Sequence, residues 1–313
     1  MIRWGVFGGS SRIYQNSLKP AFDQSGHVVV AAPSRRGDDF APYAEMLTRD
    51  DVDAVYNPLP NHLHAEWSHR ALDAGKHVLC EKPLTMSPAD SAGLFDHAES
   101  AGLTILEAYM WPHHPRARAL LRLAADGSLG TLQSGRSSFS YPMDMSSGDH
   151  RIDPRGAGAL FDIGIYCIAP FMMIAGRDPV GMAATATRNA LGVDTVMSGW
   201  IDWGGGFSAS FDVSFDAPLR KQMALSGSLG LADLPGHHVP GPSDISQIVI
   251  ERRDGSVDTV ECAGANAYAG MVSHFENVVA GKHAPIFGRS ESMRLATILD
   301  ELHQRTGAVA AVA

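Results

Sequence analysis

The chain has 313 residues, of which 45% are apolar and 19% are charged, so it is long enough for two domains with sizeable cores, and its composition argues against disorder. Its formal net charge of −9 argues against nucleic acid as a partner, because that would require a basic face. We expect a cytoplasmic protein without a membrane partner: Met1 opens directly into a strand pattern, the longest apolar stretch (163–176) is too short to span a bilayer, and the three cysteines are too widely spaced for a disulfide framework.

Strands and helices alternate along the first 125 residues. Strand patterns cover 2–8, 27–32, 77–80 and 103–107, and a further strand begins at residue 53. Helical patterns cover 12–22, 65–74, 87–101 and 115–125. This alternation predicts a parallel sheet covered by helices on both faces.

After residue 131 the pattern changes to long strands joined by short turns. These predicted strands are 132–141, 182–188, 193–203, 207–215 and 221–227, and they indicate a mostly antiparallel sheet. A helix at 160–175 interrupts them, and helices at 270–280 and 290–306 close the chain. We therefore predict an α/β protein with domains at residues 1–120 and 121–313. The segment 234–242, rich in Pro, Gly and His, is expected to be a mobile loop.

Lys82 follows a buried strand directly, within the run Glu81-Lys82-Pro83. The preceding strand, loop and helix make a βαβ unit, so the ends of both strands open on one edge of the sheet. Open α/β sheets bind their ligands at that edge, and a lysine there can reach a bound ligand. An ordinary surface lysine after a strand is the alternative.

A small-residue loop follows the first strand and leads into a helix, which is the arrangement that binds a pyrophosphate. Counted from the first glycine, the three fingerprint positions hold Gly8, Ser10 and Ile13. Gly9 supplies the missing freedom if the loop is one residue longer than usual; otherwise the segment is an ordinary tight turn. The predicted cofactor contacts in this loop are Gly8, Gly9, Ser10, Ser11, Arg12 and Ile13.

The second strand ends in Pro33, Ser34, Arg35 and Arg36, with no acidic residue to receive a ribose 2′-hydroxyl. A serine and arginines suit a 2′-phosphate better, so Ser34 and Arg35 favour NADP over NAD. The alternative is a solvated basic turn.

Asp162 and Tyr166 are four residues apart in an otherwise apolar helix, and Gly164 lies between them. A tyrosine and a carboxylate beside a lysine form a suitable set for proton transfer to or from an alcohol. Taken alone, a tyrosine such as Tyr166 is more often a core aromatic residue with a satisfied hydroxyl.

The histidines that invite a metal interpretation do not form a helical His-x-x-x-His pair with an acidic third ligand, and no cysteine pair accompanies them. We therefore predict no metal. These histidines are His62, His64, His113, His114, His237 and His238.

Three segments together resemble the Gfo/Idh/MocA oxidoreductases: Glu81-Lys82-Pro83, 107–115 and 158–166. Within that family the chain is most similar to the branch of glucose–fructose oxidoreductase and dimeric dihydrodiol dehydrogenase. The resemblance implies an N-terminal Rossmann domain and a C-terminal domain with a large open sheet often used for dimer formation. It also implies NAD(P)-dependent hydride transfer at a secondary alcohol or its ketone, commonly on sugars.

The resemblance also implies roles for individual residues. Lys82 matches the lysine on the nicotinamide side, Tyr166 the proton-transferring residue and Asp162 the carboxylate of the shared site. Further cofactor contacts are predicted at Pro60, Asn61, His64, Glu81 and Trp111.

The chain departs from the family pattern in three places. The glycine loop is altered, and seventeen residues separate Arg35 from Asp53, so a helix and a strand on the adenosine side are expected to be absent or stunted. Trp111-Pro112 stands where this branch has an aromatic residue followed by arginine. These departures keep two alternatives open beside an NADP-preferring oxidoreductase: a binding or regulatory subunit that has lost the dinucleotide, and an enzyme with a tightly held or unusual cofactor.

The substrate is not identifiable from the sequence beyond a carbohydrate-like small molecule. Loops at 141–155 and 234–242 are expected to line its pocket, where His150, Arg151 and Arg155 are able to bind a carboxylate or sugar hydroxyls. By analogy with the family, we expect a homodimer or higher homo-oligomer formed through the C-terminal sheet.

Overall fold

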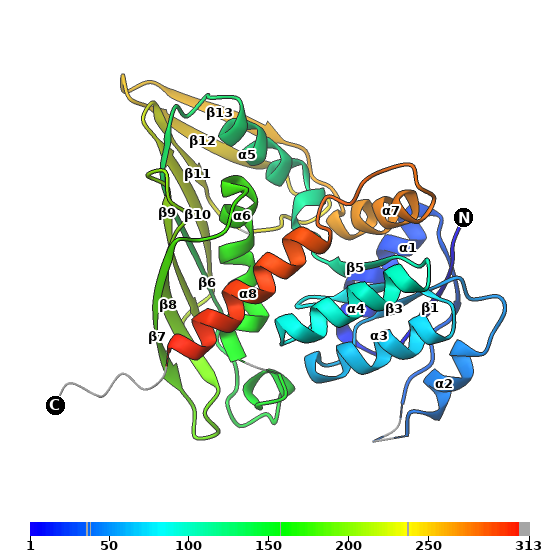
Figure 1. The fold of residues 1–313 in the computed structure, drawn as a ribbon. Coiled ribbons are helices and arrows are strands. Elements are labelled where there is room, and N and C mark those ends of the chain that lie inside the picture. The colour runs from blue at the N-terminus through cyan, green and yellow to red at the C-terminus, as the bar shows by residue number, and fades with distance from the viewer. Residues whose placement is uncertain (36, 38, 157, 237, 307–313) are drawn as a thin grey trace. The chain divides into compact units, whose positions relative to one another are not determined.

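The computed structural model describes residues 1–35, 37, 39–156, 158–236 and 238–306. The chain divides into two compact units (Figure 1). Unit 1 holds Met1–His113 and Asn266–Ala296, and unit 2 holds His114–Ala265 and the described residues from Thr297 onward.

The predicted boundary near residue 120 treats the chain as two consecutive segments, whereas the segment 266–296 groups with unit 1. Aromatic packing accounts for this return of the chain. The ring of Phe275 lies 5.2 Å from that of Trp4, which lies 5.2 Å from Phe22, and all three side chains are buried. The late segment therefore completes the core beside the first strand of the protein.

Unit 1 is built on a five-stranded parallel sheet, which confirms the predicted fold class. Its strands lie in the order β2-β1-β3-β4-β5 and are β1 (Arg3–Val6), β2 (Val28–Ala31), β3 (Ala54–Asn57), β4 (His77–Glu81) and β5 (Ile105–Ala108). Because β2 and β3 lie on opposite sides of β1, the order of strands reverses there. The loops after β1 and β3 therefore leave from adjacent carboxyl ends, where open α/β sheets bind ligands.

Helices join these strands and cover the sheet. The π-helical segment η1 (Tyr14–Leu18) continues into α1 (Lys19–Ser25), which packs against α7 (Ala267–Val279). Helix α3 (His64–Asp73) packs against α4 (Pro88–Ser100), as Figure 1 shows. The 3-10 segments η2 (Asn61–Leu63) and η3 (Trp111–His113) follow β3 and β5.

The connection between β2 and β3 is short. It contains helix α2 (Ala41–Leu47), of seven residues, and no described residue of this connection adds a further strand beyond β2 in the sheet. The helix that was expected to be absent or stunted is thus present as a short helix of about two turns.

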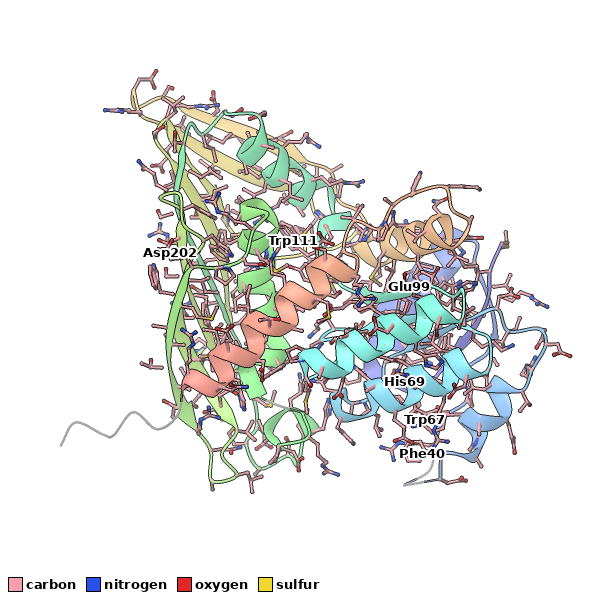
Figure 2. The ribbon with its side chains drawn as sticks, in the orientation of Figure 1. Phe40, Trp67, His69, Glu99, Trp111 and Asp202 are labelled. Carbon is pink, nitrogen blue, oxygen red and sulfur yellow. The ribbon has the colours of Figure 1, made fainter. Side chains whose placement is uncertain are left out.

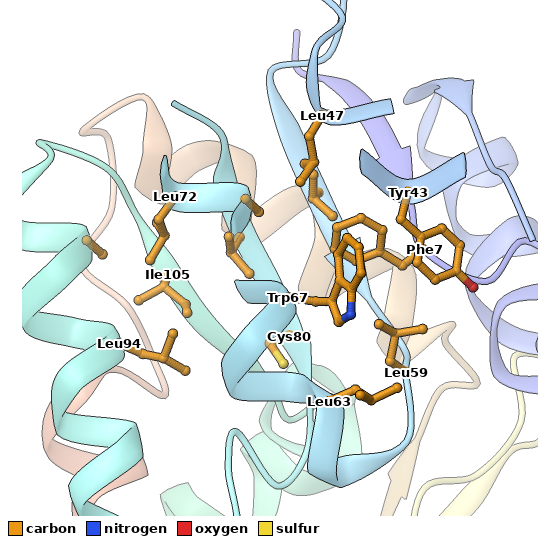
Figure 3. Close-up of a cluster of buried hydrophobic side chains, with 14 of the residues drawn as sticks. Phe7, Tyr43, Leu47, Leu59, Leu63, Trp67, Leu72, Cys80, Leu94 and Ile105 are labelled. Carbon is orange, nitrogen blue, oxygen red and sulfur yellow. The ribbon is translucent and has the colours of Figure 1, made fainter. Parts of the chain in front are cut away.

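An aromatic cluster fills one side of the unit 1 core. Trp67 of α3 packs edge-on against Phe7 at 5.3 Å and Tyr43 at 5.4 Å, and stacks on Phe40 at 5.3 Å (Figures 2 and 3). Aliphatic side chains such as Leu94 extend the same cluster toward α4. Trp67 therefore joins α3 to α2 and to the end of β1.

We expect Trp67→Ala to lower the free energy of unfolding by about 3–5 kcal/mol, because it leaves a large cavity beneath α3. Urea unfolding followed by circular dichroism measures this change. The matched control is Val28→Ala, an exposed apolar residue of β2, for which we expect about 0.5 kcal/mol. Equal losses in the two variants would contradict the central place of Trp67 in the core.

Unit 2 is built on an eight-stranded sheet in the order β13-β12-β11-β10-β6-β9-β8-β7. Its described ladders are antiparallel except the one between β6 and β9, which confirms a mostly antiparallel sheet. The strands are β6 (Leu132–Ser140), β7 (Gly181–Arg188), β8 (Asp194–Asp202), β9 (Ser208–Ser214), β10 (Arg220–Gly227), β11 (Gly230–Leu234), β12 (Ser246–Arg252) and β13 (Val257–Cys262).

The sequence did not predict β11, β12 and β13. They are short, polar at many positions and separated by glycine-rich and proline-rich turns, so their local signal is weak and their ladder with β10 decides them. In the segment 234–242, which was expected to be a loop, residues 235, 236 and 238–242 form neither helix nor strand, and His237 lies outside the described residues.

Helices of unit 2 pack on this sheet. Helix α5 (Pro115–Ala125) contacts β12 and β13, and α6 (Ile165–Ala175) contacts β6 and β9. Helix α6 continues from the π-helical segment η5 (Leu160–Gly164), and the 3-10 segment η4 (His150–Ile152) precedes it. Helix α8 (Arg289–Arg305) ends in unit 2. No helix among the described residues is both long and apolar enough to cross a membrane. Cys80, Cys167 and Cys262 are buried free thiols.

Candidate functional site

The turn after β1 depends on two glycines. Gly8 has a φ of +66°, a left-handed conformation that favours glycine, and its carbonyl accepts the N–H of Ser11 at 2.8 Å. The N–H of Gly9 donates to the carbonyl of Pro33 at 2.9 Å, and a Cβ at Gly9 would clash with the carbonyl of Ala32. Gly9 is therefore needed for close packing against the end of β2, which explains a glycine at this position and not at position 10.

The helix that follows the turn has an N-terminal cap. The hydroxyl of Ser11 accepts the N–H of Tyr14 at 3.3 Å. In the described part of the chain no acceptor is found for the N–H groups of Arg12 and Ile13, which open the helix. Such N–H groups at a helix start suit a phosphate, so these residues fit the pyrophosphate of a dinucleotide.

Ser34 and Arg35 lie at the carboxyl end of β2. The hydroxyl of Ser34 accepts the N–H of Ser10 at 2.8 Å, which links this loop to the glycine turn. The guanidinium of Arg35 lies 4.8 Å from the centre of the Phe40 ring and also donates to the carbonyl of Gly37. A basic side chain is thus held at the end of β2; its neighbour Arg36 lies outside the described residues.

The loop after β3 is organised by Asn57, which the sequence did not single out. Its side-chain oxygen accepts the N–H of Leu59 at 3.3 Å, and its amide donates to the carbonyl of His64 at 3.2 Å. Pro60 and Asn61 are partly exposed at the start of η2. His64 is fully buried, with ring nitrogens 2.8 Å from the Pro83 carbonyl and 2.7 Å from the Leu59 carbonyl. The ring thus lies between two loops, and its contact with a cofactor stays a prediction.

Buried acids hold the backbone around Lys82. One carboxylate oxygen of Glu81 accepts the hydroxyl of Tyr56, and the other accepts the N–H of Lys82 at 3.2 Å. Glu107 of β5 accepts the N–H of Leu84 at 3.1 Å. Glu81, expected to contact the cofactor, is therefore engaged by the protein itself. Tyr56 and Glu107 were not predicted, because an alternating or apolar strand pattern carries no signal for a buried hydrogen bond.

The pKa of Glu107 is raised to about 7, chiefly by burial. The charge of Glu81 raises it further, whereas Ser292, the N–H of Leu84 and the charge of Lys82 lower it. Burial and the charge of Glu81 also raise the pKa of Tyr56 well above its ordinary value. Its hydroxyl therefore stays protonated and donates a hydrogen bond to Glu81.

Trp111, labelled in Figure 2, is buried in η3. Its ring stacks on that of Tyr109 at 6.3 Å with an angle of 19° between the planes. Tyr109 in turn packs at 5.0 Å against Phe287 of the same unit. The side chain predicted to contact the cofactor is thus part of an aromatic stack after β5.

Asp162 of η5 belongs to a hydrogen-bonded network in unit 2. Its carboxylate accepts the hydroxyl of Tyr141 at 2.9 Å and lies 3.7 Å from the guanidinium of Arg151. Arg151 also donates to the Tyr141 hydroxyl at 2.7 Å and forms a two-point ion pair with Asp149. The Arg151 guanidinium holds the pKa of Asp149 well below its usual range, and burial raises the pKa of Tyr141. The network fixes Asp162 as an oriented acceptor.

Tyr166 at the start of α6 lies in an aromatic group. Its ring is 5.8 Å from Phe139 and stacks at 6.4 Å on His238, while the Lys221 ammonium lies 4.8 Å from the centre of the Phe139 ring. Burial lowers the pKa of Lys221. The sequence did not mark Lys221, because a lysine in a strand usually faces solvent.

Asp194 of β8 fixes the start of the helix that carries Asp162 and Tyr166. Its buried carboxylate accepts the N–H of Leu160 at 2.8 Å, and Gly158 (φ +81°) passes so close that a Cβ there would clash with it. Burial raises the pKa of Asp194. The helix therefore begins against a strand by a contact that the sequence did not predict.

The predicted histidines are scattered. His62 is exposed, the rings of His113 and His274 lie 5.1 Å apart, and His114 caps α5 by accepting the N–H of Arg116. Burial and two neighbouring arginines lower the pKa of His114 to about 4. Among the described residues no group of three or more His, Cys, Asp or Glu side chains is arranged to hold a metal ion.

The predicted catalytic residues form two groups. Lys82 lies at the carboxyl edge of the unit 1 sheet, and Asp162 and Tyr166 lie on one helix of unit 2. Each group is fixed within its own unit by the hydrogen bonds described above.

Two family models match this chain. The NAD-binding Rossmann fold of the Gfo/Idh/MocA oxidoreductases matches residues 13–109, and the Gfo/Idh/MocA C-terminal domain matches residues 117–233. The chain belongs to the Gfo/Idh/MocA oxidoreductase family. The family predicted from the Glu81-Lys82-Pro83 run and its companion segments is thus confirmed, and the five-stranded parallel sheet is its Rossmann fold.

Individual relatives extend over nearly the whole chain. The D-xylose 1-dehydrogenase (NADP(+)) 2 of Haloferax volcanii is 32% identical over 98% of this chain and 99% of its own length. The trans-1,2-dihydrobenzene-1,2-diol dehydrogenase of Oryctolagus cuniculus is 29% identical over 92% and 93%. The crystal structure of KijD10, a 3-ketoreductase from Actinomadura kijaniata in complex with NADP and TDP-benzene, is similar with a TM-score of 0.86 and 31% identity over 97% of each chain.

The buried carboxyl of Glu107 predicts a pH-dependent stability. Between its ordinary pKa of 4.5 and about 7, the native state keeps a proton that the unfolded state releases, so the free energy of unfolding falls as the pH rises. The difference between the two values corresponds to about 3 kcal/mol. Relative to the wild type, Glu107→Gln should therefore gain up to about 3 kcal/mol of stability between about pH 5 and pH 8, as measured by urea unfolding.

Glu99→Gln is the matched control, because Glu99 is an exposed glutamate on α4 of the same unit (Figure 2). It should keep the pH dependence of the wild type. If Glu107→Gln also ran parallel to the wild type, Glu107 would have an ordinary pKa and the assignment would be wrong.

Proposed function

We propose that the protein is an NADP-preferring oxidoreductase that transfers a hydride between the nicotinamide and a secondary alcohol or its ketone on a sugar or cyclic polyol. The observation that carries this proposal is the likeness over 98% of the chain to a relative named as an NADP-dependent D-xylose dehydrogenase. The bound NADP of KijD10 supports the same cofactor. The hypothesis of a non-catalytic subunit gains no support from these relatives, whose names are those of dehydrogenases and reductases.

Three side chains of this protein are proposed to carry out the chemistry. The nicotinamide supplies or accepts the hydride when the cofactor is bound. In the oxidative direction the Tyr166 phenolate accepts the proton of the substrate hydroxyl, and in the reductive direction the Tyr166 phenol donates it to the substrate oxygen. The Lys82 ammonium stabilises the developing oxyanion and the tyrosinate, and Asp162 orients the substrate through its carboxylate. The network of Tyr141 and Arg151 supports this role of Asp162, because it leaves the carboxylate one orientation.

The residues proposed to bind the cofactor lie at the carboxyl edge of the unit 1 sheet. Residues 8–13, which form the turn and the start of the helix, would bind the pyrophosphate. The N–H groups of Arg12 and Ile13 support this, because such groups at a helix start suit an anion. Ser34 and Arg35 would receive the 2′-phosphate, and Pro60 and Asn61 would contact the nicotinamide half. Glu81 and His64 would help to bind the cofactor by holding the backbone on either side of Lys82 in place. Trp111 would do so through its stack with Tyr109.

We further propose a homodimer or higher homo-oligomer formed through the eight-stranded sheet. Partly exposed Trp200 of β8 supports this, because a large apolar side chain on an open sheet face favours a covering partner. A cytoplasmic location remains a prediction from the sequence.

Binding of NADPH and NADH tests the cofactor, with nicotinamide fluorescence as the readout. We expect micromolar binding of NADPH and weaker binding of NADH. Arg35→Ala should weaken NADPH binding about tenfold or more and leave NADH binding unchanged, because it removes a charge-assisted bond to the 2′-phosphate. Arg49→Ala, which removes a surface arginine paired with Asp51, is the control and should bind both as the wild type does. Absence of binding in a folded, cofactor-free sample would favour the subunit hypothesis.

Turnover tests the catalytic residues in a screen of sugars and cyclic alcohols. Lys82→Ala and Tyr166→Phe should each lower kcat about 100-fold or more, because one removes the charge at the oxyanion and the other removes the proton carrier. Tyr166→Phe should still bind NADPH. The control Lys76→Ala alters a partly exposed lysine that donates to the carbonyl of Arg49, and it should keep the kcat of the wild type. Near-normal kcat in either catalytic variant would overturn its assigned role.

A further inference from the structure

His64 bridges two loops at the carboxyl edge of the unit 1 sheet. It opens α3 and is fully buried. Its Nδ1 lies 2.8 Å from the carbonyl oxygen of Pro83, and its Nε2 lies 2.7 Å from the carbonyl oxygen of Leu59. Both distances are those of good hydrogen bonds, so the imidazole is held between two backbone acceptors.

A backbone carbonyl accepts hydrogen bonds and cannot donate them, so each ring nitrogen must carry a proton to bond its partner. A neutral imidazole has one N–H and would direct the lone pair of its other nitrogen at a buried carbonyl oxygen. We infer that His64 is a doubly protonated imidazolium that ties the loop after β3 to the segment after Lys82, and that it is a positioning residue for Lys82.

Two other buried or half-buried histidines, His77 and His114, have the opposite arrangement. In His77 the Nδ1 accepts the N–H of Thr104 at 3.0 Å, and in His114 the Nδ1 accepts the N–H of Arg116 at 3.1 Å. Each of these rings must keep one nitrogen without a proton, and burial lowers the pKa of both. His64 differs from them because both of its partners are acceptors.

The charge has a cost that the two hydrogen bonds must offset. Burial disfavours a cation, and the start of α3 adds the positive end of a helix dipole. Charge-assisted bonds to carbonyl oxygens are about twice as strong as neutral ones, and His64 makes two of them. Glu81, at the carboxyl end of the neighbouring strand β4, places negative charge on the same edge of the sheet.

The consequence for function rests on the role proposed for Lys82. Leu59 directly precedes Pro60 and Asn61, and Pro83 directly follows Lys82. The imidazolium therefore sets the separation between the loop proposed to contact the nicotinamide half and the lysine proposed to stabilise the oxyanion. A displacement of about 1 Å at such a site lowers turnover strongly.

Long-range proton–nitrogen NMR on the ¹⁵N-labelled wild-type protein tests the protonation state without reference to activity. At about pH 8, where an ordinary histidine is neutral, both ring nitrogens of His64 should carry a proton. His77 and His114 should each show one nitrogen without a proton in the same spectrum. The His64 signals are identified by their loss in His64→Asn. One bare nitrogen in His64 would overturn the inference, whether or not the protein is an oxidoreductase.

Kinetics of His64→Asn test the positioning role, because the single donor nitrogen of asparagine cannot reach both carbonyls. We expect kcat to fall about tenfold or more with substrate KM changed less than twofold, since a misplaced lysine acts on the transition state. His77→Asn, at the other end of β4, is the control and should keep the kcat of the wild type. An unchanged kcat in folded His64→Asn would overturn the positioning role, while the NMR result would still decide the charge.

Discussion

The backbone from Lys82 to Leu84 is the constraint on which the candidate site depends. The N–H of Lys82, the carbonyl of Pro83 and the N–H of Leu84 lie within hydrogen-bond distance of Glu81, His64 and Glu107, respectively. These partners come from β4, the start of α3 and β5, which meet at the carboxyl edge of a parallel sheet. All three are buried, so water does not compete for the bonds, and the lysine leaves the sheet in one direction.

Unit 2 follows the same principle around Asp162. The carboxylate is held by Tyr141 and Arg151, and the helix that carries it begins against Asp194. That helix starts with a π-helical segment, as does the helix after the glycine turn of unit 1. Short π segments widen a helix locally and are frequent at functional sites. Each here is followed by regular α-helix that packs against other elements of its own unit.

Much of the fold was predictable because it follows from local pattern. The parallel strands β1 to β5 and the helices α1, α3 and α4 carry strong local patterns, and so does the alternation in β9. The Glu81-Lys82-Pro83 run and the Asp162–Tyr166 spacing identify chemistry by residue type and position, and they agree with the family that the whole chain matches. Strands β11 to β13 escaped prediction, because a weak local pattern becomes a strand when a neighbouring ladder supplies its hydrogen bonds.

The sequence by itself determined the class of sheet, the family and the residue types available for proton transfer, since these depend on periodicity and on short runs of neighbours. Tertiary structure decided which side chains support them. Tyr56, Asn57, Glu107 and Asp194 read as ordinary members of strands, yet each makes a buried hydrogen bond that fixes a loop or a helix start. His64, expected at the cofactor, lies between two carbonyls. Partners separated by up to 34 residues meet through the packing of strands and helices, and sequence patterns do not record which buried polar groups that packing brings together.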